Sequence, residues 1–185
     1  MQSLRFLTVL SIFLVTSLSW GQDVPSGPDR GKQVPPLKVF DATGPNKDKE
    51  LDYVAERKQK PTIYLFIQAD KWDRPMARFV RKLDEALQKA DDDSVVVAVW
   101  LTDNPDKAKE YLPIAQQSLQ LQKTILTCFP EEKAGPKDWN INVDAHLTAV
   151  VTTKGKVASV FGYRSINETD VPAVHDALQK VLKKQ

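Results

Sequence analysis

The chain has 185 residues, and its 26 basic and 24 acidic side chains leave a formal net charge of only +2. Its basic residues form no block, and Lys180, Lys183 and Lys184 suit the C-terminal end of a helix, so we expect no nucleic-acid partner. With one cysteine and two distant histidines, His146 and His175, the chain has no internal disulfide and no zinc or copper spacing. We expect neither a metal nor a cofactor.

The first residues are typical of a secretory signal peptide. Arg5 precedes an apolar run over residues 6–18, which is shorter than the roughly 20 residues that a membrane-spanning helix needs. Ser19-Trp20-Gly21 then offers small residues for cleavage before Gln22. We therefore expect residues 1–21 to be removed, leaving a periplasmic or secreted protein with no stable membrane span. Retention of the segment as an anchor is the alternative.

The mature chain divides into an arm and one domain. Residues 22–36 contain four prolines and two glycines among polar residues, a composition that predicts an extended, flexible arm. The remaining residues, 37–185, have the length of a single domain with one hydrophobic core.

The first half of the domain alternates between strands and helices. Residues 37–40 predict a short strand, and the spacing of the apolar residues in 49–59 predicts a helix. The β-branched and aromatic run 62–67 is typical of a strand that is covered on both faces.

The next segment predicts an amphipathic helix that begins near Pro75. Its apolar stripe consists of Met76, Phe79, Val80, Leu83 and Leu87. A second buried strand follows at 94–101, then a helix from Pro105 to about residue 119, for which Asp103 or Asn104 can provide the N-cap. Residues 123–129 predict a third buried strand.

The C-terminal part predicts a β-hairpin and a last helix. Two apolar runs, 147–152 and 157–161, flank a Lys154-Gly155 turn. An apolar stripe that begins near Asp170 predicts the terminal helix. Strand–helix alternation followed by a hairpin indicates an α/β domain with a mixed sheet.

Three segments, taken together with this order, resemble the thioredoxin superfamily and its redoxin branch of peroxiredoxin-like and thiol-disulfide proteins. The first segment, 34–44, resembles the first redoxin strand. The second is Trp72-Asp73-Arg74-Pro75-Met76, which stands where thioredoxins carry Trp-Cys-Gly-Pro-Cys. The third is the hairpin 147–157. The resemblance implies a thioredoxin-like fold. Such a fold has a central mixed β-sheet with helices on both faces, an antiparallel C-terminal hairpin and a terminal helix.

The sequence departs from the family at the residues that carry its chemistry. Asp73 and Met76 occupy the two cysteine positions, and neither a carboxylate nor a thioether can form or resolve a mixed disulfide. Leu147 stands at the position of the family's cis-proline, so we expect the His146–Leu147 peptide bond to be trans. Thiol-disulfide oxidoreductase activity is therefore not expected.

Two functions remain open. The first is a non-catalytic module that binds another exported protein or peptide through the altered loop, whose candidate residues are Trp72, Asp73, Arg74, Pro75, Met76, His146 and Leu147. Within this set, Asp73 can also be simply a helix cap. The second is a divergent thiol oxidoreductase or peroxidase that uses Cys128, although a cysteine in an apolar strand is usually a small buried hydrophobe.

Overall fold

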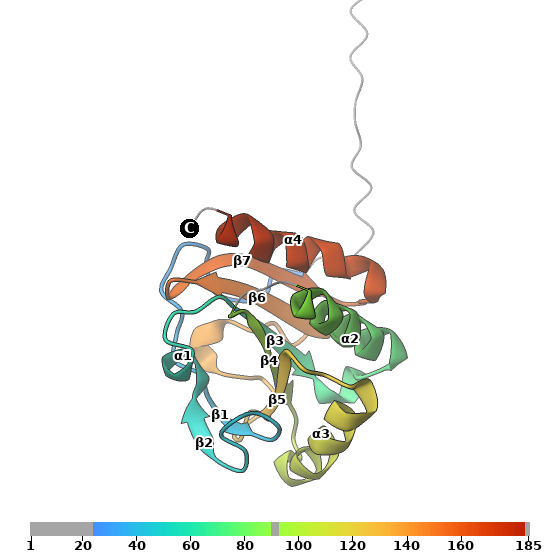
Figure 1. The fold of residues 1–185 in the computed structure, drawn as a ribbon. Helices are drawn as coiled ribbons and strands as arrows, with labels where there is room; N and C mark the ends of the chain where they lie inside the picture. The colour runs from blue at the N-terminus through green and yellow to red at the C-terminus, as the bar shows by residue number, and fades with distance from the viewer. Residues whose placement is uncertain (1–23, 90–92, 184–185) are drawn as a thin grey trace, which may run out of the picture.

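One mixed β-sheet organises the domain. The computed structural model describes residues 24–89 and 93–183, so the predicted signal peptide lies outside the described residues (Figure 1). The sheet has the strand order β2-β1-β5-β4-β3-β6-β7. Its strands are β1 (Lys38–Asp41), β2 (Glu50–Asp52), β3 (Thr62–Gln68), β4 (Val95–Leu101), β5 (Thr124–Cys128), β6 (Leu147–Thr153) and β7 (Lys156–Tyr163). The helices are α1 (Tyr53–Glu56), α2 (Arg74–Gln88), α3 (Pro105–Leu119) and α4 (Val171–Leu182), with 3₁₀ turns η1 (Ala69–Lys71), η2 (Lys137–Trp139) and η3 (Glu168–Asp170).

Strand β3 lies at the centre of the sheet. It pairs in parallel with β4, which pairs in parallel with β5, and it pairs antiparallel with β6. Every residue of β3 is buried, as its continuous apolar sequence predicts. The hairpin of β6 and β7 is antiparallel. These pairings confirm the α/β architecture with its mixed sheet and C-terminal hairpin.

The two faces of the sheet are covered unequally. The three long helices α2, α3 and α4 all contribute to one core layer on one side of the sheet, with α1 on the other (Figure 1). On the second face, Trp139 of η2 is fully buried, contacts the rings of Tyr64 and Phe66, and donates from Nε1 to the carbonyl oxygen of Pro36 at 3.0 Å. One tryptophan in a long connection therefore covers sheet surface that a helix would otherwise cover. None of the helices in the described ranges is long and apolar enough to cross a bilayer.

The helix predicted over 49–59 is replaced by a strand and a single helical turn. Residues Glu50–Asp52 form β2 and pair antiparallel with β1. Asp52 then caps α1 by accepting hydrogen bonds from the backbone N–H groups of Val54 and Ala55. The apolar stripe in this segment is too short to stabilise a helix in competition with main-chain pairing to β1.

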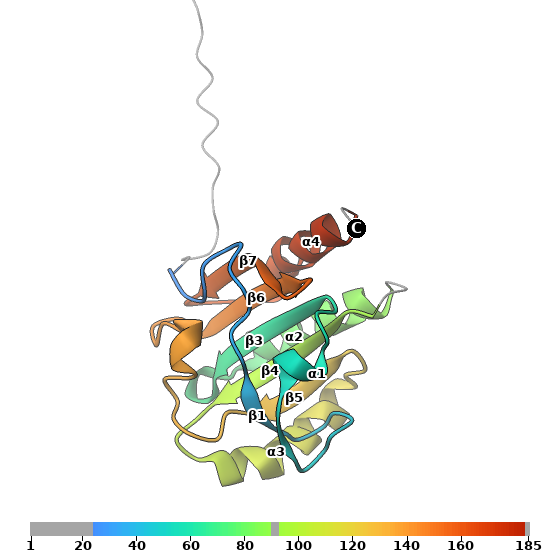
Figure 2. The same cartoon turned by 90° about the vertical axis from the view of Figure 1, so that its left-hand side faces the viewer.

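The arm differs from the flexible segment that its composition predicts. Its backbone runs along the outer edge of β7, where the N–H groups of Val24 and Gly31 donate to carbonyl oxygens of the strand at 2.8–2.9 Å (Figure 2). The Val34 N–H donates at 2.9 Å to the Gly155 carbonyl oxygen in the turn before β7. Close approach requires a glycine in β7, because a Cβ on Gly162 would lie 2.1 Å from the Val24 carbonyl oxygen. The arm thus satisfies a strand edge that would otherwise be open to pairing.

A buried carboxylate joins α2 to the turn before β5. Asp84 is 1% exposed and accepts a hydrogen bond from the Lys123 N–H at 2.8 Å, a second from the Gln122 N–H, and a third from the Gln88 amide. These contacts fix the position of α2 over the sheet, and α2 carries the start of the candidate site.

We predict that Asp84→Ala lowers the free energy of unfolding by about 2–4 kcal/mol, because two backbone N–H groups lose their acceptor in a buried place. Denaturant titration of wild type and variant measures the difference. Glu85→Ala is the matched control on the same helix, and we expect little change because the ion pairs of an exposed side chain contribute little. Equal effects of the two substitutions would contradict the role given to Asp84.

Candidate functional site

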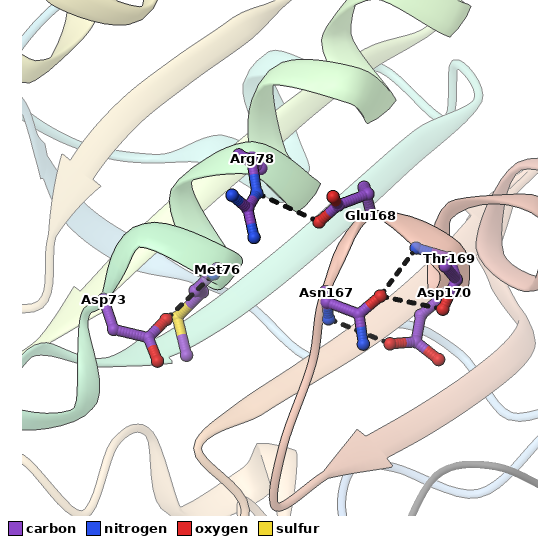
Figure 3. A network of polar contacts seen from close by, with 7 residues as sticks. All are labelled: Asp73, Met76, Arg78, Asn167, Glu168, Thr169 and Asp170. Carbon is purple, nitrogen blue, oxygen red and sulfur yellow. Dashed lines mark hydrogen bonds and ion pairs between the residues drawn. The ribbon is translucent and has the colours of Figure 1, made fainter.

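The N-terminal end of α2 is closed by a carboxylate. Asp73 is the N-cap, and its Oδ1 accepts a hydrogen bond from the Met76 N–H at 2.9 Å (Figure 3). Pro75 lies in the first turn, where its missing N–H leaves no donor unpaired. The capping role expected for Asp73 is confirmed. The positive end of the helix dipole favours a carboxylate at this place, and the carboxylate in turn stabilises the helix.

A second link holds α2 to the C-terminal part of the chain. Arg78 Nε donates to Glu168 Oε2 of η3 at 3.1 Å (Figure 3). Asn167 and Asp170 form a capping box at the same turn. These contacts lie at the surface and orient the loop before α4.

Two of the residues proposed for the binding surface are in the core. Met76 is 2% exposed and Leu147 is 0% exposed, and both belong to the core layer beneath α2. The expectation that these side chains could contact a partner is therefore wrong, because each fills space between helix and sheet. The described peptide bonds include no cis bond, so the trans His146–Leu147 bond is confirmed. The carbonyl oxygen of His146 accepts from the Gln68 N–H at 3.0 Å.

Trp72 forms an aromatic wall with Tyr111 of α3. Its Nε1 donates to the Tyr111 hydroxyl at 3.0 Å, and its ring packs on Trp100 with centroids 4.7 Å apart and planes tilted by 59°. Trp72 is half-buried, whereas Tyr111 is 41% exposed. We call this pair the Trp72–Tyr111 wall.

The wall separates two surface hollows. The first, of about 390 Å³, lies between α2 and α3, and the second, of about 440 Å³, lies between the end of β4 and α3. The first is lined by Trp72, Asp73, Arg74, Ala77, Tyr111, Ile114, Ala115, Ser118 and Leu119. The second is lined by Ala69, Asp70, Trp72, Trp100, Thr102, Asn104, Lys107, Ala108 and Tyr111. We call them the α2–α3 hollow and the β4–α3 hollow.

The site therefore extends toward α3 rather than toward the loop before β6. Trp72, Asp73 and Arg74 line the α2–α3 hollow, whereas neither His146 nor Leu147 lines either hollow. Sequence reasoning missed Tyr111 and Ile114, which is 64% exposed. The available signal was two large apolar side chains on α3 that fall outside its buried face.

Cys128 lies apart from these hollows, in the core at the end of β5. It is fully buried, and its Sγ lies 3.5 Å from the carbonyl oxygen of Phe129. Burial raises the pKa of the Cys128 thiol to about 11, although Lys109 lowers this pKa slightly by its positive charge. At neutral pH the group is a protonated thiol without access to solvent, which is a poor nucleophile.

Comparison with known proteins places the fold. No protein-family model matches the chain, and no curated protein matches its sequence. Among solved structures, peroxidoxin BcpB from Mycobacterium tuberculosis is 13% identical with a TM-score of 0.62, over 83% of this chain and 98% of that one. A peroxiredoxin-like protein from Aquifex aeolicus is 12% identical with a TM-score of 0.59, over 87% and 92%. A DsbF homologue from Corynebacterium diphtheriae is 17% identical with a TM-score of 0.57, over 90% and 99%.

These similarities and the observed topology show a thioredoxin-like fold. Within that class, this chain has a single cysteine, and that cysteine is not in the loop at the start of α2.

We predict that Cys128 in the folded protein reacts with a thiol reagent at pH 8 at least about 100-fold more slowly than in denaturant, because burial blocks access and disfavours the thiolate. Timed labelling with and without guanidinium measures the ratio.

Because the pKa of the Cys128 thiol is raised in the folded state, we also expect the free energy of unfolding to fall from about pH 9 to pH 11, with a smaller fall in Cys128→Ala. Rapid stoichiometric labelling of the native protein would contradict this account.

Proposed function

We propose that this protein is an exported, non-catalytic binding module that contacts its partner through the Trp72–Tyr111 wall and the two hollows beside it. The observation that carries the proposal is the Trp72–Tyr111 wall, with Trp72 half-buried and Tyr111 exposed, beside the carboxylate cap of α2. Trp and Tyr are enriched among the residues that carry most of the binding energy at protein interfaces. Export rests on the signal-peptide pattern of the first residues.

The alternative is a thiol enzyme that works through Cys128. That reaction requires a thiolate, access for the substrate and a second group that resolves the oxidised sulfur. The burial and raised pKa of Cys128 oppose the first two requirements, and the sequence has no second cysteine for the third. These observations favour the binding module.

We predict that the mature protein neither reduces insulin disulfides with dithiothreitol nor consumes hydrogen peroxide with a thiol donor at rates above the blank. The reason is the absence of an accessible thiolate. A spectrophotometric assay with an active thioredoxin as positive control measures both rates. Turnover that disappears in Cys128→Ser would establish the thiol enzyme instead.

We predict that Ile114→Ser and Tyr111→Ala each reduce capture of the partner from native extracts by at least about five-fold, because each removes apolar contact area at the centre of an interface. Quantitative mass spectrometry of material retained by the immobilised mature protein gives the ratio. Val143→Ser is the matched control, since Val143 is 62% exposed and lines neither hollow. Capture that depends on Val143 and not on Ile114 would place the interface elsewhere.

A further inference from the structure

The turn before α4 carries the only asparagine of the chain that has serine or threonine two residues after it. Asn167-Glu168-Thr169 fits the acceptor pattern for N-linked glycosylation, in which any residue except proline stands in the middle. Every other asparagine has aspartate or asparagine at the second following position, and these are Asn46, Asn104, Asn140 and Asn142. A three-residue pattern also occurs by chance, so the geometry of the turn has to support it.

This turn is fixed at the surface by its two ends. Ile166 before it and Val171 after it are buried in the same core layer as α2 and α4. Between them, Thr169 is exposed and Asn167 is half-buried. The pattern therefore lies in an accessible turn, which is where an N-linked sugar is tolerated, because a bulky hydrophilic group has to remain in water.

The two polar atoms of the Asn167 amide have different roles in the turn. Its Oδ1 accepts hydrogen bonds from the Thr169 N–H at 2.9 Å and from the Thr169 hydroxyl at 2.7 Å (Figure 3). The N–H donor identifies this atom as the amide oxygen, since an amide nitrogen cannot accept it. The Nδ2 atom has no hydrogen-bond partner in the described part of the chain and is not among its buried unpartnered atoms. The oxygen is engaged while the nitrogen is available.

The structural role of Asn167 is compatible with modification of its nitrogen. Asn167 is the N-cap of η3, and its backbone N–H donates to Asp170 Oδ2 at 2.9 Å to complete the capping box. A substituent on Nδ2 leaves Oδ1 free to accept both hydrogen bonds from Thr169. The Thr169 hydroxyl therefore orients the amide and also completes the acceptor pattern.

We propose that Asn167 is the acceptor for an N-linked oligosaccharide in the exported protein. A new bond joins Nδ2 to the anomeric carbon of the first sugar, and the bond from that carbon to a lipid-linked diphosphate breaks. The diphosphate leaves with the bonding electrons, and Nδ2 loses one proton to a base of the transferase. Nothing is oxidised or reduced. This inference rests on the export in the proposed function and adds a modification site to it.

The test is peptide mapping of the full-length gene product, purified from the compartment to which its own cell exports it. Trypsin cleavage after Arg164 and Lys180 releases residues 165–180, in which Asn167 is the only asparagine. Mass spectrometry measures whether this peptide carries the added mass of an oligosaccharide, and fragmentation locates the residue that carries it.

We expect the added mass in wild type and in Thr169→Ser, which keeps the hydroxyl, and its loss in Thr169→Ala and Asn167→Asp. Asn167→Asp removes the amide nitrogen but keeps an oxygen for the cap, and aspartate is as good an N-cap as asparagine, so this variant folds. Asn140→Asp is the matched control, because Asn140 is exposed but lies outside the acceptor pattern. The sugar on Asn167 should be unchanged in this control.

An unmodified 165–180 peptide in the exported wild-type protein would overturn the inference. So would an added mass that persists in Asn167→Asp, because the sugar would then be attached to another residue. N-terminal sequencing of the same sample separates this inference from the proposed function. If the chain begins at Gln22 and Asn167 is unmodified, export stands and only the glycosylation falls. If the chain retains Met1, stays inside the cell and is unmodified, both are overturned.

Discussion

Burial of β3 on both faces is the constraint on which the rest of the domain depends. All seven of its residues are buried, so each face of the sheet needs a cover. Three long helices provide one cover, and short elements held around Trp139 provide the other. Asp84 fixes α2 over the sheet, and the chain that leaves β3 must then turn sharply into α2. That turn brings Trp72 to the surface beside α3 and determines where the candidate site lies.

The same position in the fold serves different chemistry according to the side chain at the start of α2. A helix N-terminus stabilises an anion, and in a thiol enzyme this effect stabilises a reactive thiolate. Here the anion is the Asp73 carboxylate, which satisfies the Met76 N–H and has no redox chemistry. In this chain the helix N-terminus stabilises the cap, and the cap stabilises the helix. The surface around Asp73 then does not have to hold a thiolate within reach of a disulfide.

Local patterns predicted the long elements, and contacts between distant residues determined the rest. The apolar stripe of α2 and the continuous runs of β3 and β4 each extend over several residues, so their type was evident from sequence. Pairing of β2 with β1 and of the arm with β7 uses backbone hydrogen bonds, which leave no mark in a side-chain pattern. Asp73 was readable as a cap because capping is local. The contribution of Tyr111 and Ile114 to the candidate site could not be predicted from the sequence, because it depends on how α3 lies beside α2.

The packing of Met76 bears on how readily this chain could acquire a dithiol loop. Cysteines at positions 73 and 76 would require two substitutions, and the second would replace a side chain that fills the core with a smaller one. The first would replace the carboxylate cap at position 73 with a thiol, while position 76 would still hold a buried methionine that cannot pair with it. Each single step therefore lowers stability before the pair can yield any activity. A dithiol loop at this place is therefore opposed by the packing of the core around Met76.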